Sequence, residues 1–388
     1  MRRKGSGTTR KLPSGRYQAR IVRPDGKRES LGTYRTKTEA ERALVRAEAE
    51  QIEGAWEPTP DNPGTVAEWG EKWLAEAHHL KPKTVAGHIQ MLHKHVLPRW
   101  ENIPITSVTK ADIREWVGDL ITGGCKPDVI RCSVDALRLS CKAALEAGII
   151  STNPVIGISL PRRPKREMHP LTIEQIEALA EAISHPELKP GGNGARVGRS
   201  ERPDLGLAVR LAAYTGLRAG ELWAIRRKHV DLDHRIIRVM ESVTEVGGEL
   251  IFGSTKTGAN RAVTWPASLD EAIANHLATR PDDPDALVFV STTDTPMRHS
   301  GFMKRSFKPA LERAGLPQGT RFHDLRHTHA SLLIAMGAHP KAIQERLGHS
   351  SITITLNIYG HLFPGLGDEL AQGLDTLIQN QRGHDEGI

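Results

Sequence analysis

Two proline-broken segments divide this chain into three parts, and they constrain its fold more than any other feature. Residues 54–64 contain Pro58, Pro60 and Pro63, and residues 160–166 read Leu-Pro-Arg-Arg-Pro-Lys-Arg. Proline lacks a backbone donor and interrupts both helices and inner strands. A chain of 388 residues is long enough for two or three domains. The sequence therefore predicts a multidomain α+β protein whose parts differ in secondary structure.

Positive charge is concentrated at the N-terminus. Residues 1–37 hold twelve Lys or Arg and two acids, whereas the whole chain has a net charge of +7. The remainder is therefore acidic on balance. Such a basic block is an electrostatic footprint for a polyanion, and the alternative is a solvated tail.

Residues 1–57 are predicted to form a small β-sheet-plus-helix DNA-binding domain. Residues 1–13 are expected to lack order on their own, and residues 15–23 and 27–34 alternate as two strands around a turn. A sheet with arginines on one face can enter a DNA groove. The predicted DNA contacts are Arg16, Arg20, Arg23, Lys27 and Arg28.

A helix is expected to complete this domain. Thr38 and Glu41 fit a capping box, in which each side chain satisfies a free backbone N–H group of the first turn. The helix is predicted to end near Glu53, before the first linker.

The second part, residues 65–158, reads as an all-α domain. Apolar spacing predicts helices over residues 66–78, 82–95, 109–121 and 127–147, the first with a capping box at Thr65. Trp69 and Trp73 fit a core face better than a base-stacking surface. The three cysteines are expected to be buried thiols of a protein in a reducing cytoplasm, at Cys125, Cys132 and Cys141.

Residues 159–169 are predicted to be a basic linker between domains. A proline-rich, strongly positive segment can follow a phosphate backbone while joining two domains around a duplex. Its predicted DNA contacts are Arg162, Arg163, Lys165 and Arg166.

The third part, residues 170–388, is predicted to be mainly helical with a small antiparallel sheet. A capping box at Thr172 and Gln175 begins its first helix. Strand-like runs cover residues 235–240, 249–252 and 261–264, and helices return from about residue 300.

Chemistry-bearing residues gather in this third part. Arg218 lies in a turn between Gly216 and Gly220, and these glycines are expected to permit close backbone approach to a ligand. Downstream come the run His323-Asp324-Leu325-Arg326, then Leu347-Gly348-His349, and then Tyr359. Arginine matches two phosphate oxygens at once, and tyrosine offers a hydroxyl nucleophile. This set suits attack on a phosphodiester without a metal.

The ordered set Thr-Gly-Leu-Arg-x-Gly-Glu-Leu, Lys-Thr, His-x-Leu-Arg-His, Leu-Gly-His and Tyr resembles the tyrosine recombinases of the phage integrase family. The resemblance covers most of the chain. It implies an N-terminal arm-type DNA-binding domain, a core-binding domain that is a SAM-like helical bundle, and a C-terminal catalytic domain. The implied activity is site-specific DNA cleavage and religation through a 3′-phosphotyrosyl intermediate, as in an integrase or excisionase of a phage or mobile element.

The resemblance also implies roles for single residues. Tyr359 would be the nucleophile, Arg218 and Arg326 the phosphate clamp, and Lys256 the general acid. His323 would accept a proton from Tyr359, His349 would bind the phosphate, and Glu221 would orient a neighbour. The sequence alone does not rank the roles of the two histidines. His327 and His329 fall outside the catalytic positions and are expected to be structural or capping residues.

The expected partners are double-stranded DNA with core-type and arm-type sites, a homotetramer on paired sites, and accessory DNA-bending or directionality proteins. No cofactor and no metal are expected. The chain shows no apolar run long enough to span a membrane, so no transmembrane segment is expected. The resemblance implies a place in the bacterial host cytoplasm, in association with the nucleoid. The alternatives are a type IB topoisomerase, a metal-dependent nuclease built on His323, His327 and His329, and a repressor of the same fold without activity.

Overall fold

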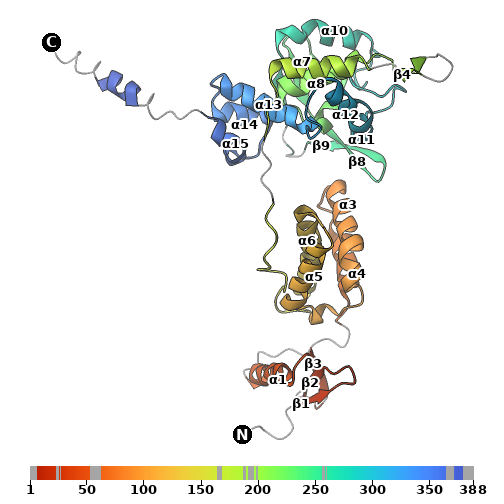
Figure 1. The fold of residues 1–388 in the computed structure, drawn as a ribbon, viewed down its shortest axis with the longest axis vertical. Helices are drawn as coiled ribbons and strands as arrows, with labels where there is room; N and C mark the ends of the chain where they lie inside the picture. Colours follow the sequence, from red (N-terminus) through yellow and green to blue (C-terminus); the bar gives the residue numbers. More distant parts are fainter. Residues whose placement is uncertain are drawn as a thin grey trace. The chain divides into compact units, whose positions relative to one another are not determined.

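The computed structural model describes residues 7–22, 26, 28–52, 63–163, 168–186, 189–190, 196–197, 200–255, 258, 260–363 and 371–378. The chain forms two compact units, Met1–Lys165 and Arg166–Ile388. Figure 1 shows a small sheet with one helix near the N-terminus, a helical bundle, and a larger C-terminal part that is mostly helical. The architecture is multidomain α+β, as the sequence predicts.

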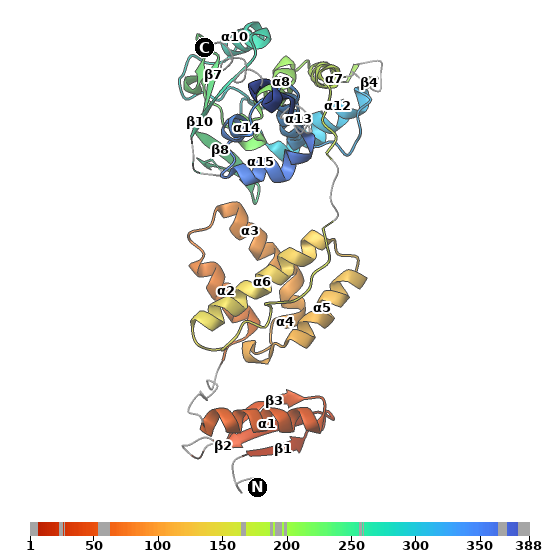
Figure 2. The ribbon, with the colours of Figure 1, turned by 90° about the vertical axis from the view of Figure 1, so that its left-hand side faces the viewer.

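The N-terminal sheet is three-stranded and antiparallel, in the order β1-β2-β3. Its strands are β1 (Gly7–Lys11), β2 (Tyr17–Val22) and β3 (Arg28–Tyr34), and α1 (Lys37–Ile52) packs along one face (Figure 2). Ala19 and Ile21 alternate along β2 and are fully buried, and Ile21 packs with Leu44 and Ala47 of α1. Arg20 therefore lies on the opposite face of the sheet, as a period of two requires.

Two expectations for this domain were wrong in detail. Residues 7–11 are not without order, because β1 pairs with β2 along its whole length. A polar strand of this kind shows no hydrophobic alternation, so only its partner reveals it. The capping box also begins two residues earlier, with Thr36 Oγ1 accepting from Glu39 N at 3.2 Å and Glu39 Oε2 accepting from Thr36 N at 3.2 Å.

A helical bundle follows residues 53–62, which lie outside the described part of the chain. Its helices are α2 (Val66–Glu76), α3 (Pro82–Met91), α4 (Leu97–Trp100), α5 (Lys110–Thr122) and α6 (Pro127–Glu146). A π-helical turn, Leu92–Val96, joins α3 to α4, so this helix runs beyond its predicted end at residue 95. Pro98 cannot donate a backbone hydrogen bond, and a π turn accommodates such a gap.

The bundle core contains the predicted tryptophans. Trp69 is 9% exposed and Trp73 packs on the same cluster, which confirms a packing role for both. The prediction for the cysteines was only partly right, because Cys141 is buried, Cys125 is half-buried and Cys132 is exposed. Cys132 lies in the first turns of α6, on the face opposite its buried positions.

The first residues of the basic linker fold back on the bundle. Arg131 of α6 donates from Nε and Nη2 to the carbonyl oxygen of Pro161, at 3.1 and 2.9 Å. Arg163 forms an ion pair with Asp128 at 2.5 Å. Residues 160–163 are therefore fixed on α6 rather than free.

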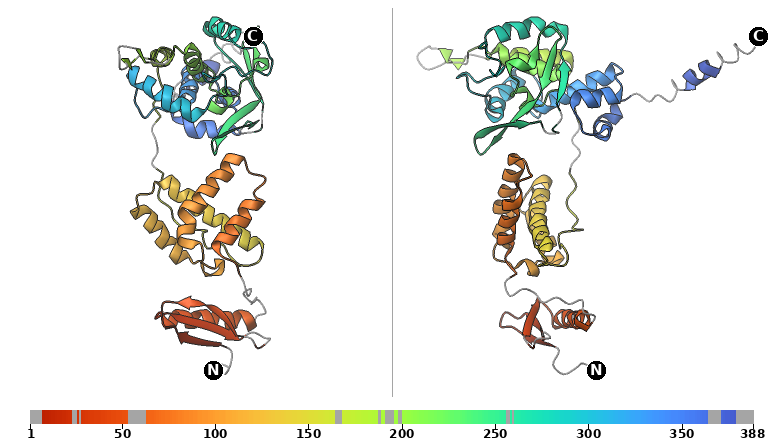
Figure 3. Two further views of the ribbon diagram at one scale, coloured as in Figure 1. Left: turned by 90° about the vertical axis from the view of Figure 1, so that its right-hand side faces the viewer. Right: turned by 180° about the vertical axis from the view of Figure 1, so that it is seen from behind.

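The second unit is mostly helical (Figure 3). Its helices are α7 (Ile173–Ser184), α8 (Pro203–Thr215), α9 (Ala219–Leu222), α10 (Asp270–Ala278), α11 (His299–Phe302), α12 (Lys308–Arg313), α13 (Phe322–Ala335), α14 (Pro340–Leu347) and α15 (Ile352–Tyr359). The capping box predicted at Thr172 and Gln175 is present at the start of α7.

Small antiparallel sheets accompany these helices. One has the order β10-β7-β6, with β6 (Val230–Asp231), β7 (Ile236–Val239) and β10 (Arg261–Thr264), and another is the hairpin of β8 (Glu241–Val246) and β9 (Glu249–Ser254). A further two-stranded pair is β4 (Lys189–Pro190) with β5 (Arg196–Val197). Within the described ranges, no helix is both long and apolar enough to cross a membrane.

Replacing Leu137 with Ala is expected to loosen the helical bundle. Leu137 of α6 is fully buried, and such a cavity costs about 2–5 kcal/mol. Hydrogen exchange of the α2 and α6 amides in the full chain should accelerate. The matched control is Ile121→Ala on α5, where Ile121 is 51% exposed. Equal exchange rates in both variants would contradict this assignment of the core.

Candidate active site

Three segments of the second unit converge on the C-terminal end of α14. Arg261, Arg326 and Arg218 donate to the carbonyl oxygens of residues 346, 347 and 348 in that order, at 3.0, 2.5 and 3.2 Å. The last carbonyls of a helix have no partner within the helix and carry partial negative charge. Three guanidinium groups therefore satisfy this helix end and are held close to one another by it.

Arg218 lies where it does because α8 ends in a tight turn. Gly216 is the C-cap of α8 in the left-handed conformation, with φ of 68°, and Arg218 is the N-cap residue of α9. The turn thus separates α8 from α9 by three residues and leaves the Arg218 side chain beside the end of α14.

The two glycines of this turn serve packing rather than ligand approach, which corrects the prediction. A Cβ atom on Gly216 would lie 2.7 Å from the His329 ring and 2.8 Å from a Leu347 methyl carbon. A Cβ atom on Gly220 would lie 2.6 Å from the carbonyl oxygen of Val243. Gly216 thus lets the end of α8 lie against α13 and α14, and Gly220 lets α9 lie against β8.

Glu221 is the carboxylate at the centre of this cluster. It is 2% exposed and accepts from Arg261 Nη1 and Nη2 at 3.0 and 2.7 Å. It also accepts from Arg218, from Nη1 at 2.8 Å and from the backbone N–H at 2.9 Å. Burial acts to raise the pKa of Glu221, but these hydrogen bonds and charges outweigh it and lower the pKa to about 2. Glu221 thus holds both Arg218 and Arg261 by hydrogen bonds, and Arg261 is a further arginine that sequence reasoning missed.

Arg326 is the most deeply buried of the three arginines, at 2% exposure. Besides its bond to α14, its Nη1 donates to the carbonyl oxygen of Gly216 at 2.6 Å. Burial and the neighbouring charge of Arg218 lower its pKa to about 9, so it stays protonated at neutral pH. Arg326 therefore ties α13 to both the α8–α9 turn and α14.

Arg218 and Arg326 retain N–H donors that are available for a ligand. A guanidinium group has five N–H groups. Within the described part of the chain, Arg218 commits two of these to Glu221 and Gly348, and Arg326 commits two to carbonyl oxygens. The remaining donors are suited to the oxygens of a phosphate group.

His349 follows the left-handed Gly348 that ends α14. Its Nδ1 lies 2.9 Å from the hydroxyl of the buried Thr355. Burial, together with Arg326 and Arg218, lowers the pKa of His349 to about 4. A neutral His349 can donate a hydrogen bond from its other ring nitrogen, Nε2.

Tyr359 is the last residue of α15 and is 1% exposed. Its hydroxyl lies 2.8 Å from Nδ1 of His327. Burial raises the pKa of Tyr359 to about 12, against the opposing charge of Arg326. The expectation that His327 is only structural or capping did not foresee this contact. His323, one helical turn earlier, is exposed and makes a ring contact with His327 at 4.9 Å.

His329 makes contacts of a structural kind. It is 4% exposed, and its Nε2 accepts from Arg346 Nε at 2.9 Å. Arg346 also donates to the backbone and hydroxyl oxygens of Thr264 on β10. These bonds hold α13, α14 and β10 together behind the cluster.

Lys256 lies outside the described residues, between the described ends of β9 and β10. Among the predicted DNA contacts, Arg23, Lys27, Lys165 and Arg166 also lie outside them. Arg16 is exposed, and Arg20 and Arg28 stand on β2 and β3.

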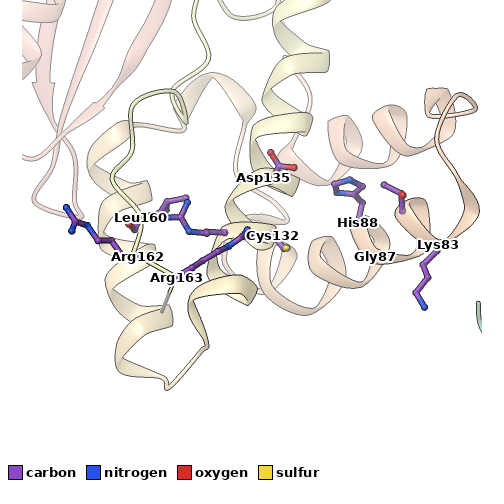
Figure 4. Close-up of a pocket in the computed structure, with 10 residues that line it drawn as sticks. Lys83, Gly87, His88, Cys132, Asp135, Leu160, Arg162 and Arg163 are labelled. Atoms are coloured by element: carbon purple, nitrogen blue, oxygen red, sulfur yellow. Dashed lines mark hydrogen bonds between the residues drawn. The ribbon is translucent and has the colours of Figure 1, made fainter. Parts of the chain in front are cut away.

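Arg162 and Arg163 line a pocket on the helical bundle (Figure 4). Lys83 and His88 of α3 and Arg131 of α6 contribute to the same pocket. Two helices and the linker thus present basic side chains together.

No group of three His, Cys, Asp or Glu side chains within the described ranges is placed to hold a metal ion. Asp324, the carboxylate nearest the histidines in sequence, accepts from Arg321 Nη2 at 2.7 Å and from Arg321 N at 2.8 Å. It caps its own helix.

Replacing Glu221 with Gln should flatten the acid unfolding profile. The pKa of Glu221 in the fold, about 2, lies below its ordinary value of 4.5. Its ionised form therefore stabilises the fold fully above about pH 4.5, and this is lost as the pH falls toward 2. The shift corresponds to about 3 kcal/mol, which the variant lacks at pH 7. Urea unfolding between pH 2 and 7 measures this, and an unchanged pH slope in the variant would contradict it.

Known proteins share this arrangement of parts. Residues 168–365 match the phage integrase family, residues 5–54 the phage integrase N-terminal domain, and residues 65–121 the phage integrase N-terminal SAM-like domain. A putative prophage phiRv2 integrase of Mycobacterium tuberculosis is 30% identical over 390 residues, covering 98% of this chain and 97% of the relative.

Solved structures show the same fold. The Tn1549 transposon integrase in complex with a circular intermediate DNA aligns with a TM-score of 0.65 at 22% identity, over 81% of this chain and 99% of that one. The lambda integrase tetramer bound to a Holliday junction aligns with a TM-score of 0.58 at 21% identity, over 92% of this chain and 96% of that one. The chain belongs to the phage integrase family and is a tyrosine-type site-specific DNA recombinase.

Proposed function

We propose that Tyr359 attacks the scissile phosphate of a duplex DNA site, giving a 3′-phosphotyrosyl link and a free 5′-hydroxyl. The hydroxyl of a partner strand then attacks that link and releases Tyr359. The observation that carries the proposal is the convergence of Arg218, Arg326 and His349 on the end of α14, with Tyr359 packed against the same helix pair. Bond energy stays in the protein–DNA ester, so the exchange needs no nucleotide cofactor.

Arg218 and Arg326 would clamp the non-bridging oxygens of this phosphate. The diester gains a second negative charge as phosphorus becomes pentavalent, and fixed donors stabilise that charge without reorganisation. Each such donor contributes about 10²–10³ in rate. His349 would add a neutral N–H donor to the same phosphate.

Lys256 would protonate the leaving 5′-oxygen, as the resemblance implies. The strands β9 and β10 flank its position, and Arg261 anchors the start of β10 to Glu221. The strand that follows Lys256 in the sequence is thus held at the arginine cluster.

The chain would act on DNA as an assembly. The solved relatives named above are held on a circular intermediate DNA and, for the lambda integrase, as a tetramer on a Holliday junction. By this analogy, four copies would pair two core-type sites in the bacterial cytoplasm, on the nucleoid. The N-terminal sheet, through its face that carries Arg20, would bind separate arm-type sites, and accessory DNA-bending or directionality proteins would set the direction.

Replacing Tyr359 with Phe should abolish the covalent protein–DNA adduct and leave duplex affinity unchanged, because only the nucleophilic oxygen is lost. Adduct is measured by denaturing gel with a nicked cognate duplex. Tyr214→Phe is the matched control, since Tyr214 donates its hydroxyl to Glu177 away from the cluster. Adduct formation by the Tyr359 variant would overturn the proposal.

Recombination should continue in excess EDTA, because arginine side chains supply the positive charge that a metal supplies in other phosphoryl-transfer sites. The measurement compares the rate of adduct formation before and after chelation. A loss restored by a divalent ion would favour the metal-dependent nuclease chemistry instead.

A further inference from the structure

The hydroxyl of Tyr359 already has a partner that the motif pattern does not assign. Its Oη lies 2.8 Å from Nδ1 of His327, which is a normal hydrogen-bond distance. His323, the histidine to which the resemblance gives the role of proton acceptor, makes its ring contact with His327. The two histidines are four residues apart on α13 and so lie on one face of that helix.

Packing restricts the side chain of Tyr359 to the neighbourhood of His327. It is 1% exposed and packs with Ala330 and Ile334 of α13 and with Ile343 and Leu347 of α14. Both α13 and α14 also hold the arginine cluster, through Arg326 and the carbonyls at the α14 end. His327 and Arg326 are thus both on α13, and Tyr359 of α15 packs against the α13–α14 pair to which Arg218 and Arg326 bind.

The protonation states of both groups allow Tyr359 to be the donor of this hydrogen bond. Burial raises the pKa of Tyr359 to about 12, so its hydroxyl keeps its proton at neutral pH. Burial, followed by the charges of Arg321 and Arg326, lowers the pKa of His327, while Asp324 acts to raise it. His327 is therefore neutral, and a neutral ring accepts at one nitrogen. The hydroxyl of Tyr359 can therefore donate to Nδ1 in the tautomer whose ring proton lies on Nε2, which is the arrangement that proton transfer to Nδ1 requires.

We propose that His327 is a catalytic residue that takes the proton of Tyr359 as the phenol oxygen attacks phosphorus. This inference rests on the proposed role of Tyr359 as nucleophile. The O–H bond of Tyr359 breaks, its proton moves to Nδ1, and its electron pair forms the O–P bond. The P–O5′ bond breaks, and its electron pair leaves on the 5′-oxygen, which receives a proton from Lys256. In religation the His327 imidazolium returns its proton to the departing phenolate.

A nearby anion favours this transfer. His327 becomes positively charged when it takes the proton, and it then lies among other titratable and charged groups. The negative charge of the bound phosphate compensates for the positive charge of the arginines among them. These groups are His323, Asp324 and Arg326 on α13, Arg321 at its N-cap, Tyr359 on α15 and His349 after α14.

The variant His327→Asn distinguishes a residue that takes the proton of Tyr359 from one that only holds Tyr359 in place by a hydrogen bond. Asparagine places an amide oxygen near the position of Nδ1, so it can still accept from Tyr359 but cannot take the proton. General-base catalysis is worth about 10²–10⁴ in rate. We expect adduct formation on a nicked duplex to fall at least about a hundredfold at unchanged duplex affinity. The rise of the wild-type rate with pH, through the titration of His327 below pH 6.5, should be lost in the variant.

A second experiment uses a DNA substrate in which sulfur replaces the bridging 5′-oxygen of the scissile phosphate. A thiolate leaves without protonation, so this substrate should rescue Lys256→Ala, which lacks the proposed acid. It should not rescue His327→Asn, because the nucleophile still needs to lose its proton. His185→Asn, at an exposed histidine of α7's C-cap paired with Glu181, is the control that keeps wild-type rates.

Three outcomes would overturn the proposal. These are wild-type cleavage by His327→Asn, full rescue of that variant by the sulfur substrate, and loss of the pH-dependent rise in His323→Asn instead. If His327→Asn fails to fold, as judged by its melting temperature and duplex binding, His327→Gln takes its place with the same expectations. If Tyr359 is not the nucleophile, the Tyr359→Phe variant would still form the covalent adduct, and this result distinguishes that failure from a failure of the His327 proposal.

Discussion

The buried bond between Glu221 and two arginines is the interaction on which the catalytic unit depends. Glu221 receives four hydrogen bonds from Arg218 and Arg261, and both arginines continue to the end of α14. The carboxylate comes from the first turn of α9 and Arg261 from the start of β10. One anion therefore fixes the positions of a helix, a strand and a second helix end. Removing it would leave buried positive charge without compensation, which proteins tolerate poorly.

The same cluster leaves an excess of positive charge. Three guanidinium groups share a single carboxylate and the partial charge of a helix end, and the pKa of Arg326 is lowered to about 9 as a result of burial and of Arg218. A phosphate that enters this space relieves the repulsion among the arginines. This repulsion favours binding of the phosphate anion, and it favours the doubly charged pentavalent transition state still more.

The helix pair α13–α14 connects this charge to the nucleophile. Arg326 and His327 are neighbours on α13, and their side chains reach α14 and Tyr359 respectively. A shift of α13 relative to α14 and α15 would change both contacts at once. The geometry thus couples phosphate binding to the environment of the phenol oxygen.

Much of this was predictable from the sequence. Capping boxes at Thr65 and Thr172 marked helix starts correctly, because a Thr and a Glu or Gln three residues apart satisfy free N–H groups locally. At the N-terminal domain, Thr36 and Thr38 both fit that pattern, and only the packing of α1 decides between them. Local signals cannot separate two equally good caps.

Long-range contacts account for what sequence reasoning missed. Arg261 is 40 residues from Glu221, and a strand arginine with no glycine or histidine beside it carries no local sign of its role. The role proposed for His327 rests on its contact with Tyr359 of α15, which is 32 residues away in the sequence. Gly216 and Gly220 signalled close approach correctly, but the approaching atoms belong to His329, Leu347 and Val243 rather than to a ligand.

The central claim, that fixed arginines neutralise the charge of the attacked phosphate, is tested most directly by removing that charge from the DNA. A methylphosphonate at the scissile position replaces one charged oxygen with a methyl group. If the account is correct, Arg218→Ala cleaves the ordinary phosphate at least about a hundredfold more slowly than the unaltered chain, and this deficit shrinks at least tenfold on the methylphosphonate. An equal deficit on both substrates would contradict it.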